Sequence, residues 1–271
     1  MEKTLEKNGT GEQRPAVADM APLIHRIRQL ATQEKARTLP PPLSPEELAQ
    51  RFSFAGRRQG KPEVILSEDV FVELGPPREA SRGIVLLTFD PGLVVPGRIR
   101  LSGPDLSAMH QGESRSFGQV VMLSIDPENI PDPFDLDNTQ YLMHRISGYM
   151  VRSIPGRLWV RVSKAGRKNG LTLHAIGSAL IAAYTRDFPG VRAAEVLFVT
   201  GDAGQVEELS QVSVEAGILS GQHKKLALNM DGSVECTDLS CDTCDEKPVC
   251  DNLRDVVVKR RKRAGGQAET D

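Results

Sequence analysis

The amino-acid sequence predicts an α+β fold, with mainly antiparallel strands in the first half, α/β-type alternation of helices and strands in the second half, and a C-terminal cysteine loop. Two observations predict this class. Short apolar runs separated by Gly, Pro and Asp turn residues fill the chain between Glu63 and Pro131, as in a sheet joined by tight turns. After Pro133, helical and strand periodicities alternate, which is typical of helices packed on a sheet.

Residues 1–62 are predicted to form an N-terminal arm, of which roughly the first 17 residues are polar and charged, as in a disordered segment. Apolar residues at helical spacing predict a helix over Asp19–Arg37, and Pro40–Pro42 end it. Ser44, with Glu47 three residues later, has the pattern of a capping box at the start of a second helix. We expect this arm to dock on the rest of the chain or on a partner.

Residues 63–230 are predicted to form the α+β domain, because apolar runs and periodicities recur throughout this part of the chain. Five strands are expected in its first part, at Val64–Leu66, Val70–Leu74, Gly83–Phe89, Gly97–Leu101 and Phe117–Ile125. In its second part, helices are expected at Asp135–Met150, Leu173–Tyr184 (capped by Thr172) and Val206–Ala216, and strands at Leu158–Val162 and Ala194–Thr200.

Composition and charge restrict the class of protein. The 271 residues carry a formal net charge of -2 and a pI near 6.3. These values argue against a protein that binds nucleic acid over its whole surface. No apolar window is long enough for a membrane helix, and Met1–Gly11 lacks the apolar core of a signal peptide. We therefore expect a cytoplasmic protein, in which cysteines more often bind metal than form disulfides.

All four cysteines lie in the segment 231–258, which we interpret as a metal-binding loop with the spacing Cys236-x4-Cys241-x2-Cys244-x5-Cys250. Structural zinc usually has two Cys-x2-Cys pairs, and this loop has one. An iron–sulfur cluster accepts less regular spacing, and the first three cysteines match the start of the plant-type two-iron pattern. The spacing favours an iron–sulfur cluster and leaves zinc open as the alternative.

Trp159 is the only tryptophan, and it lies in a predicted strand between two arginines. Because side chains alternate along a strand, Arg157, Trp159 and Arg161 are expected on one face. An aromatic ring flanked by guanidinium groups suits an adenine ring and phosphates. The alternative is that Trp159 packs in the core and the arginines are charges at its rim.

The remaining sequence offers few other candidates for chemistry. It contains no glycine-rich phosphate loop and no nucleophile motif, so no catalytic residue is identified. The histidines, including His144 and His174, have no partner at metal-ligand spacing and are expected to make local hydrogen bonds. The tail, residues 259–271, is predicted to be basic and disordered, and its run Lys259–Arg263 is either solvated or contacts an acidic partner.

Several separated motifs resemble the middle domain of acetyl-CoA synthase, the β subunit of the carbon monoxide dehydrogenase/acetyl-CoA synthase complex. The resemblance covers roughly residues 64–250. The motifs that carry it are Val72–Gly75, Ser102–Asp105, Gly118–Val121, Leu142–Met150, Leu158–Lys164, Lys168–Gly177 and Asp187–Phe188, followed by Ser240–Cys241, Cys244 and Val249–Cys250.

This resemblance implies a four-iron cluster. Cys241, Cys244 and Cys250 match its ligands, Cys244 matches the ligand that also bridges to nickel, and Cys236 could replace the fourth ligand. The spacing to Cys250 is shorter than in the family. The family's N-terminal domain and its nickel-binding C-terminal domain have no counterpart in the sequence given, so nickel is not supported by a full set of ligands.

The resemblance also implies a coenzyme A site and a role in one-carbon metabolism, the metabolism of carbon monoxide and acetyl-CoA. Arg157, Trp159, Arg161 and Lys164 would bind coenzyme A, with the cations holding its phosphates. We expect an accessory, assembly or electron-transfer subunit of a carbon monoxide dehydrogenase/acetyl-CoA synthase-type system. Two alternatives stay open: one half of a split acetyl-CoA synthase that needs a partner chain, and a zinc-stabilised binding module that uses Lys259–Arg263.

Overall fold

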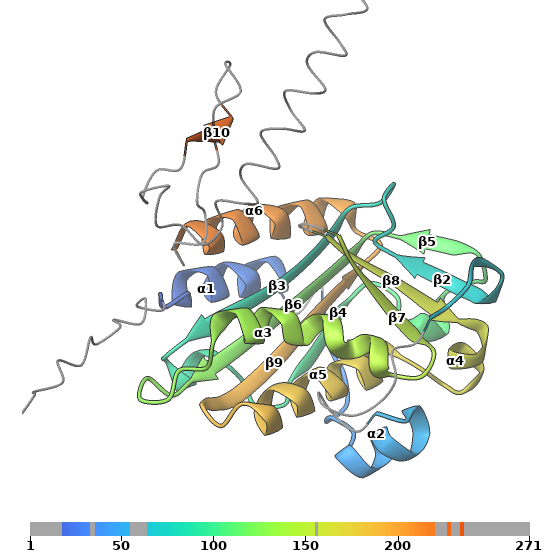
Figure 1. Cartoon of the computed structure of the whole chain (residues 1–271), viewed down its shortest axis with the longest axis horizontal. Coiled ribbons are helices and arrows are strands. Elements are labelled where there is room, and N and C mark those ends of the chain that lie inside the picture. Colours follow the sequence, from blue (N-terminus) through green and yellow to red (C-terminus); the bar gives the residue numbers. More distant parts are fainter. Residues whose placement is uncertain are drawn as a thin grey trace, which may run out of the picture. The chain divides into compact units, whose positions relative to one another are not determined.

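Figure 1 shows the computed structural model of the chain. It describes residues 18–32, 36–54, 64–154 and 157–219, together with the backbone of two short strands, β10 (Ala227–Leu228) and β11 (Val234–Glu235). The chain divides into two compact units, Met1–Ala216 and Gly217–Asp271.

The first unit contains a five-stranded sheet with the strand order β1-β4-β9-β6-β3 (Figure 1). Its central strand pair, β9 and β6, is antiparallel and runs in register from Phe117↔Thr200 to Ser124↔Ala193. The outer pairs β3–β6 and β4–β9 are parallel, whereas β1–β4 is antiparallel. The strands are β1 (Arg37–Thr38), β3 (Ser81–Thr88), β4 (Ile99–Ser102), β6 (Phe117–Ile125) and β9 (Val191–Thr200).

A second sheet of four strands has the order β5-β2-β8-β7. Strand β8 pairs antiparallel with both β2 and β7, and β2 pairs parallel with β5. The strands are β2 (Val70–Leu74), β5 (Glu113–Arg115), β7 (Tyr149–Ile154) and β8 (Arg157–Ser163).

The α+β class predicted from the sequence is confirmed, and both sheets are mixed. Among the strands of the first half, β1–β4 is antiparallel, while β2–β5 and β3–β6 are parallel. None of these strands pairs with its next neighbour along the chain, so tight turns do not impose an antiparallel direction on the pairs. Short apolar runs predict strands, but they do not predict which strands pair.

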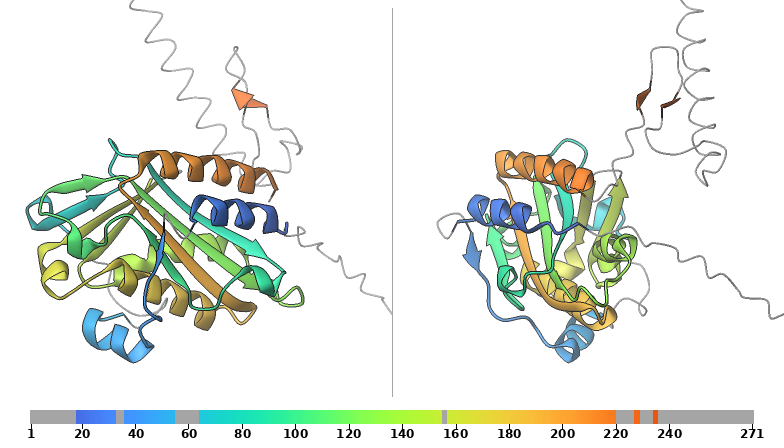
Figure 2. Two further views of the ribbon diagram at one scale, coloured as in Figure 1. Left: turned by 180° about the vertical axis from the view of Figure 1, so that it is seen from behind. Right: turned by 90° about the vertical axis from the view of Figure 1, so that its left-hand side faces the viewer.

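Helices cover both faces of the five-stranded sheet. The helices α1 (Ala21–Leu30) and α6 (Ala203–Leu219) lie side by side on one face, where Ile24, Ile27 and Leu209 are buried in one apolar cluster (Figure 2). The opposite face packs against α5 (Leu173–Asp187) and the inner face of the four-stranded sheet in the larger cluster. The remaining helical segments are α2 (Pro45–Phe52), α3 (Pro133–Thr139), α4 (Lys164–Lys168), η1 (Ser67–Asp69), η2 (Pro91–Leu93), η3 (Leu106–Ala108) and η4 (Gln140–Arg145).

The described part of the N-terminal arm docks on the body of the same chain. The capping box predicted at Ser44 and Glu47 is present at the start of α2, and Leu48 and Phe52 of this helix are buried in the main core. The backbone N–H of Leu43 donates to Ser178 Oγ on α5 at 3.0 Å. Because the arm also adds β1 to the edge of the five-stranded sheet, it is an integral part of the first unit.

The helix predicted over Asp135–Met150 is wrong in its second half. The α-helix ends at Thr139, a 3-10 segment continues to Arg145, and β7 begins at Tyr149. Gly148 makes this change of direction, since its φ of 83° is a conformation that favours glycine and it packs against the backbone of Gly166. The predicted strand Val64–Leu66 is also absent, because this segment is extended without ladder pairing and leads into η1.

The described part of the second unit comprises the last residues of α6 and the strands β10 and β11, which pair antiparallel with Ala227 opposite Glu235. Cys236, Cys241, Cys244, Cys250 and the run Lys259–Arg263 lie outside the described residues. None of the helices in the described part of the chain is long and apolar enough to cross a membrane.

Candidate functional site

The outer face of β8 carries the residues that the sequence singled out. Leu158, Val160 and Val162 are buried toward the core, while Arg157, Trp159 and Arg161 alternate with them and are half-buried on the opposite face. The expected sharing of one face is therefore confirmed, and Trp159 does not pack in the core cluster.

Two guanidinium groups lie at the indole ring of Trp159. The guanidinium carbon of Arg161 is 5.1 Å from the ring centroid, and that of Arg152 is 4.9 Å from it. Arg152 comes from β7, where it is paired in register with Trp159. Both distances lie within the range of cation–π attraction. The indole N–H of Trp159 is buried and has no hydrogen-bond acceptor among the described residues.

Arg161 is fixed by an ion pair across the sheet. Its Nε donates to the carboxylate of Glu73 on β2 at 2.7 Å, and the two residues are paired in register. Its Nη1 also donates to the carbonyl oxygen of Ile65 at 3.3 Å. The ion pair neutralises the charge of Arg161 and sets the position of its guanidinium against the ring.

Arg157 and Lys164 both bind backbone carbonyl groups of the protein. Arg157 Nη2 donates to the carbonyl oxygens of Pro76 (2.9 Å) and Glu79 in the turn between β2 and β3. Lys164 Nζ donates to the carbonyl oxygen of Glu68 at 2.6 Å. Carbonyl bonds leave the charges in place, so these side chains still contribute positive potential, but their donors are partly used.

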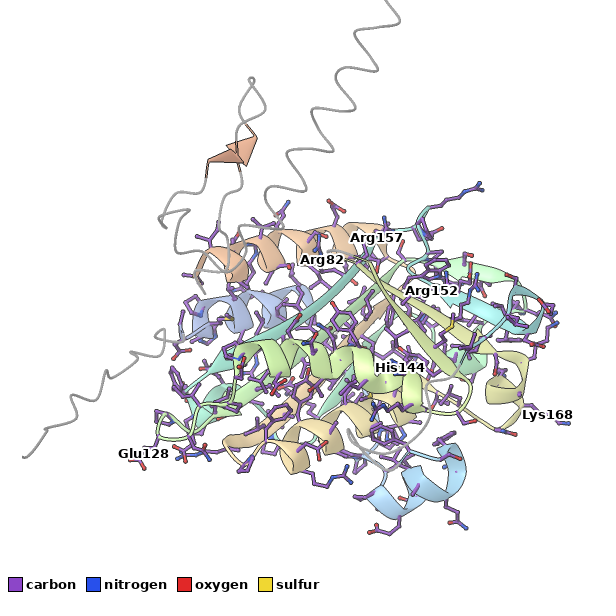
Figure 3. The ribbon with its side chains drawn as sticks, viewed as in Figure 1. Arg82, Glu128, His144, Arg152, Arg157 and Lys168 are labelled. Carbon is purple, nitrogen blue, oxygen red and sulfur yellow. The ribbon has the colours of Figure 1, made fainter. Side chains whose placement is uncertain are left out.

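Arg152 differs from the other cations of the site. Its side chain is exposed, and within the part of the chain that the structure describes it makes no hydrogen bond or ion pair. Figure 3 labels Arg152 and Arg157, which come from the neighbouring strands β7 and β8. Sequence reasoning missed Arg152 because the predicted helix ran to Met150 and no strand was predicted after it, although Met150 and Arg152 alternate with Tyr149 and Val151 as in a strand.

The described residues hold no cluster of metal-ligating side chains. Among them, no group of three or more His, Cys, Asp or Glu side chains could hold a metal ion. His144 Nδ1 bonds the carbonyl oxygen of Tyr141 at 2.7 Å, and His174 Nε2 bonds that of Pro41 at 2.9 Å. The local hydrogen-bonding role predicted for the histidines is thus confirmed for His144, whereas His174 bonds a residue of the N-terminal arm that is distant in the sequence. The four predicted metal ligands lie outside the described residues.

The arrangement at β8 is suited to binding. An indole ring can stack on a planar base, and guanidinium groups beside the ring can bind the phosphates of the same ligand. Glu73, the acidic neighbour of the ring, is engaged by Arg161.

Residues 53–206 match the family model described as CO dehydrogenase/acetyl-CoA synthase complex beta subunit. The chain is also 26% identical over 148 residues to the acetyl-CoA decarbonylase/synthase complex subunit beta of Methanothermobacter thermautotrophicus, which is 54% of this chain and 32% of that protein. The protein of the same name in Methanopyrus kandleri is 27% identical over 151 residues, which is 54% of this chain and 31% of that protein. The matches thus span about a third of the length of these relatives, and the family match contains the Trp159 site.

Proposed function

The chain belongs to the CO dehydrogenase/acetyl-CoA synthase complex beta subunit family, and we propose that it works in one-carbon metabolism as an accessory, assembly or electron-transfer subunit that binds coenzyme A. One observation carries the binding proposal: Trp159 presents its ring on an outer sheet face, with the guanidinium groups of Arg152 and Arg161 against it. Both curated relatives are named as subunits of a complex, which supports a role beside protein partners.

The chemistry of coenzyme A matches this face. Its adenine ring can stack on an indole, which is worth about 1–3 kcal/mol per base in nucleic-acid complexes. Its phosphates require cations. Arg157 and Arg161 flank Trp159 along β8, and Lys164 lies at the start of α4. Because Glu73 already neutralises Arg161, we assign Arg161 to holding the ring in place and the other cations to the phosphates.

The binding proposal can be tested with intrinsic fluorescence, because Trp159 is the only tryptophan of the chain. We expect saturable quenching of its emission by coenzyme A, and heat of binding in calorimetry that disappears in Trp159→Leu. The matched control is Phe71→Leu, which removes an aromatic ring from β2. Wild-type protein that shows neither quenching nor heat at millimolar coenzyme A would refute the site.

We also propose that Cys236, Cys241, Cys244 and Cys250 hold an iron–sulfur cluster of the four-iron type. Four thiolates within one short segment form a donor set that fits such a cluster, and β11 ends at Glu235, directly before the first of them. When bound, a cluster of this kind supplies one-electron transfer. The same thiolates also fit zinc, which is the alternative that metal analysis must exclude.

Anaerobic purification followed by metal analysis and an absorption spectrum tests the cluster. We expect iron and inorganic sulfide in near-equal amounts and a broad visible absorption, both lost in Cys244→Ala. Full-length protein that is colourless and contains zinc would refute the cluster and favour a zinc-stabilised binding module. Thr243→Ala, which alters the same segment without removing a thiolate, is the control.

A second candidate function is one half of a split acetyl-CoA synthase. The observation that favours it is the extent of the similarity, since only about a third of each curated relative is matched. In this case another polypeptide would provide the rest of the site, and nickel would accompany the iron. Stoichiometric nickel in the purified protein would support this function, whereas iron alone would favour the accessory role.

A further inference from the structure

We infer that Arg152 is a specificity-determining residue of the Trp159 site. When an adenine base stacks on the indole ring, the Arg152 guanidinium leaves the ring and binds a phosphate group of the same ligand. This inference rests on the proposed binding of coenzyme A. It concerns a residue that comes from a different strand than the binding residues predicted from the sequence.

Arg152 is held at the ring by a weak contact. Its guanidinium carbon lies 4.9 Å from the ring centroid, and the side chain is exposed. Within the described residues, no carboxylate or carbonyl oxygen accepts a hydrogen bond from it. A cation–π contact at an exposed site is worth only about 0.5–1 kcal/mol. Arg152 can therefore leave the ring at small cost.

Arg161 cannot leave the ring in the same way. It is about as close to the ring, at 5.1 Å, but its side chain is only 14% exposed and it is paired with Glu73 at 2.7 Å. Its movement would leave a half-buried carboxylate without a partner, which costs more than a cation–π contact gains. Arg157 and Lys164 are likewise held by backbone carbonyl groups. Among these four cations, Arg152 is thus the one whose donors all lack an acceptor within the described residues.

The exchange makes the site selective for phosphorylated nucleotides. A base that stacks on the indole displaces Arg152, and the lost cation–π contact lowers the gain from stacking. A nucleotide with a phosphate replaces that contact with a charge-assisted hydrogen bond to the displaced guanidinium, which is stronger than the contact it replaces. An unphosphorylated nucleoside offers no such replacement, so the site should bind it poorly.

The test compares coenzyme A, ADP and adenosine in fluorescence titrations of the full-length protein and of Arg152→Ala. We expect the variant to bind coenzyme A and ADP about tenfold more weakly, corresponding to a loss of about 1.4 kcal/mol. Adenosine should bind equally well or more tightly, because the ring is no longer covered. Arg152→Lys should recover part of the affinity for ADP, since it restores the charge but not the planar fork.

Each other outcome has a definite meaning. Equal weakening of ADP and adenosine would show a merely structural role for Arg152, and unchanged affinities would overturn the inference while leaving the coenzyme A site intact. If the wild-type protein binds none of the three ligands, the proposed function itself fails, and this inference with it. Arg37→Ala, which removes an exposed arginine from β1 in the other sheet, controls for net charge and should change no affinity.

Discussion

Glu73 and Arg161 face each other across β2 and β8 and form an ion pair of 2.7 Å on the outer face of the four-stranded sheet. The same guanidinium reaches the ring of Trp159 and the carbonyl oxygen of Ile65. One side chain therefore connects β2, the segment before η1 and the tryptophan. The position of the ring thus depends on the Glu73 carboxylate, which acts through Arg161. Glu73 and Arg161 are far apart in the sequence, and strand pairing brings them together.

Glu73→Gln should destabilise the protein by about 1 kcal/mol, because it leaves the half-buried Arg161 without its counter-ion. Urea unfolding of Glu73→Gln, Arg161→Met and the double variant measures the coupling between the two residues. The double variant should lose less stability than the sum of the single variants. Strict additivity would mean that the pair contributes nothing to stability.

Glu195→Gln should destabilise the protein by about 3 kcal/mol or more. Glu195 is fully buried on β9, where it accepts hydrogen bonds from Arg98 (2.8 Å from Nε) and from the backbone N–H of Val95 (3.1 Å), and Arg28 of α1 lies 3.6 Å away. A neutral side chain at this position leaves the half-buried guanidinium groups of Arg98 and Arg28 without their counter-ion.

The matched control for Glu195 is Glu215→Gln. Glu215 also pairs with an arginine of α1, Arg26 at 2.6 Å, but its side chain is 47% exposed. Its loss should cost less than about 1 kcal/mol. Thermal or urea unfolding of both variants checks the difference, and equal costs would contradict the role of burial in the Glu195 cluster.

Stability should fall in acid partly through Glu113. The backbone N–H of His110 donates to this carboxylate at 2.8 Å and lowers its pKa below the ordinary value; partial burial opposes this shift, and Arg115 adds to it. A lowered folded-state pKa stabilises the protein above the unfolded-state pKa, and this stabilisation is lost as the pH falls through the folded-state pKa.

The measurement for Glu113 is urea unfolding of wild type and Glu113→Gln between about pH 6 and pH 3. The wild type should be more stable at the upper end, and the difference should shrink toward the lower end. Glu207→Gln removes an exposed carboxylate of α6 that makes no hydrogen bond or ion pair with the described residues, and it should show no such convergence. A constant difference for Glu113→Gln would contradict the prediction.

Local patterns in the sequence predicted much of the fold. The strand Phe117–Ile125 was predicted with the bounds that the structure shows, and the N-caps at Ser44 and Thr172 are present with their hydrogen bonds. Each of these depends on a few neighbouring residues. The helix assigned across residues 146–150 failed because Gly148 turns the chain there through a contact with Gly166, which lies far along the sequence.

Of the candidate site, the sequence predicted only the features that depend on neighbouring residues within one strand. Trp159 and Arg161 share a face because of alternation within one strand, which the sequence shows. Strand pairing brings Arg152 to the ring and Glu73 to Arg161, and the register of distant strands depends on the whole fold. Sequence reasoning therefore found one strand of the site and missed the residues on both of its neighbours.

Gly148→Ala should be strongly destabilising, and Gly112→Ala provides the matched comparison. Both glycines have a positive φ, 83° and 82°, so alanine should cost about 1–2 kcal/mol of backbone strain at either position. At Gly112 an added Cβ meets no atom within 4 Å, whereas at Gly148 it collides with the backbone of Gly166. Urea unfolding should therefore show a clearly larger loss for Gly148→Ala.

The same substitution should also disturb the Trp159 site, because Gly148 directly precedes β7, the strand that positions Arg152. In protein that is still folded, the emission of Trp159 should shift in Gly148→Ala and stay unchanged in Gly112→Ala. Equal costs of the two substitutions would show that backbone conformation alone fixes glycine at position 148. A larger cost without a change in emission would show that the contact with Gly166 stabilises the turn but does not set the position of Arg152.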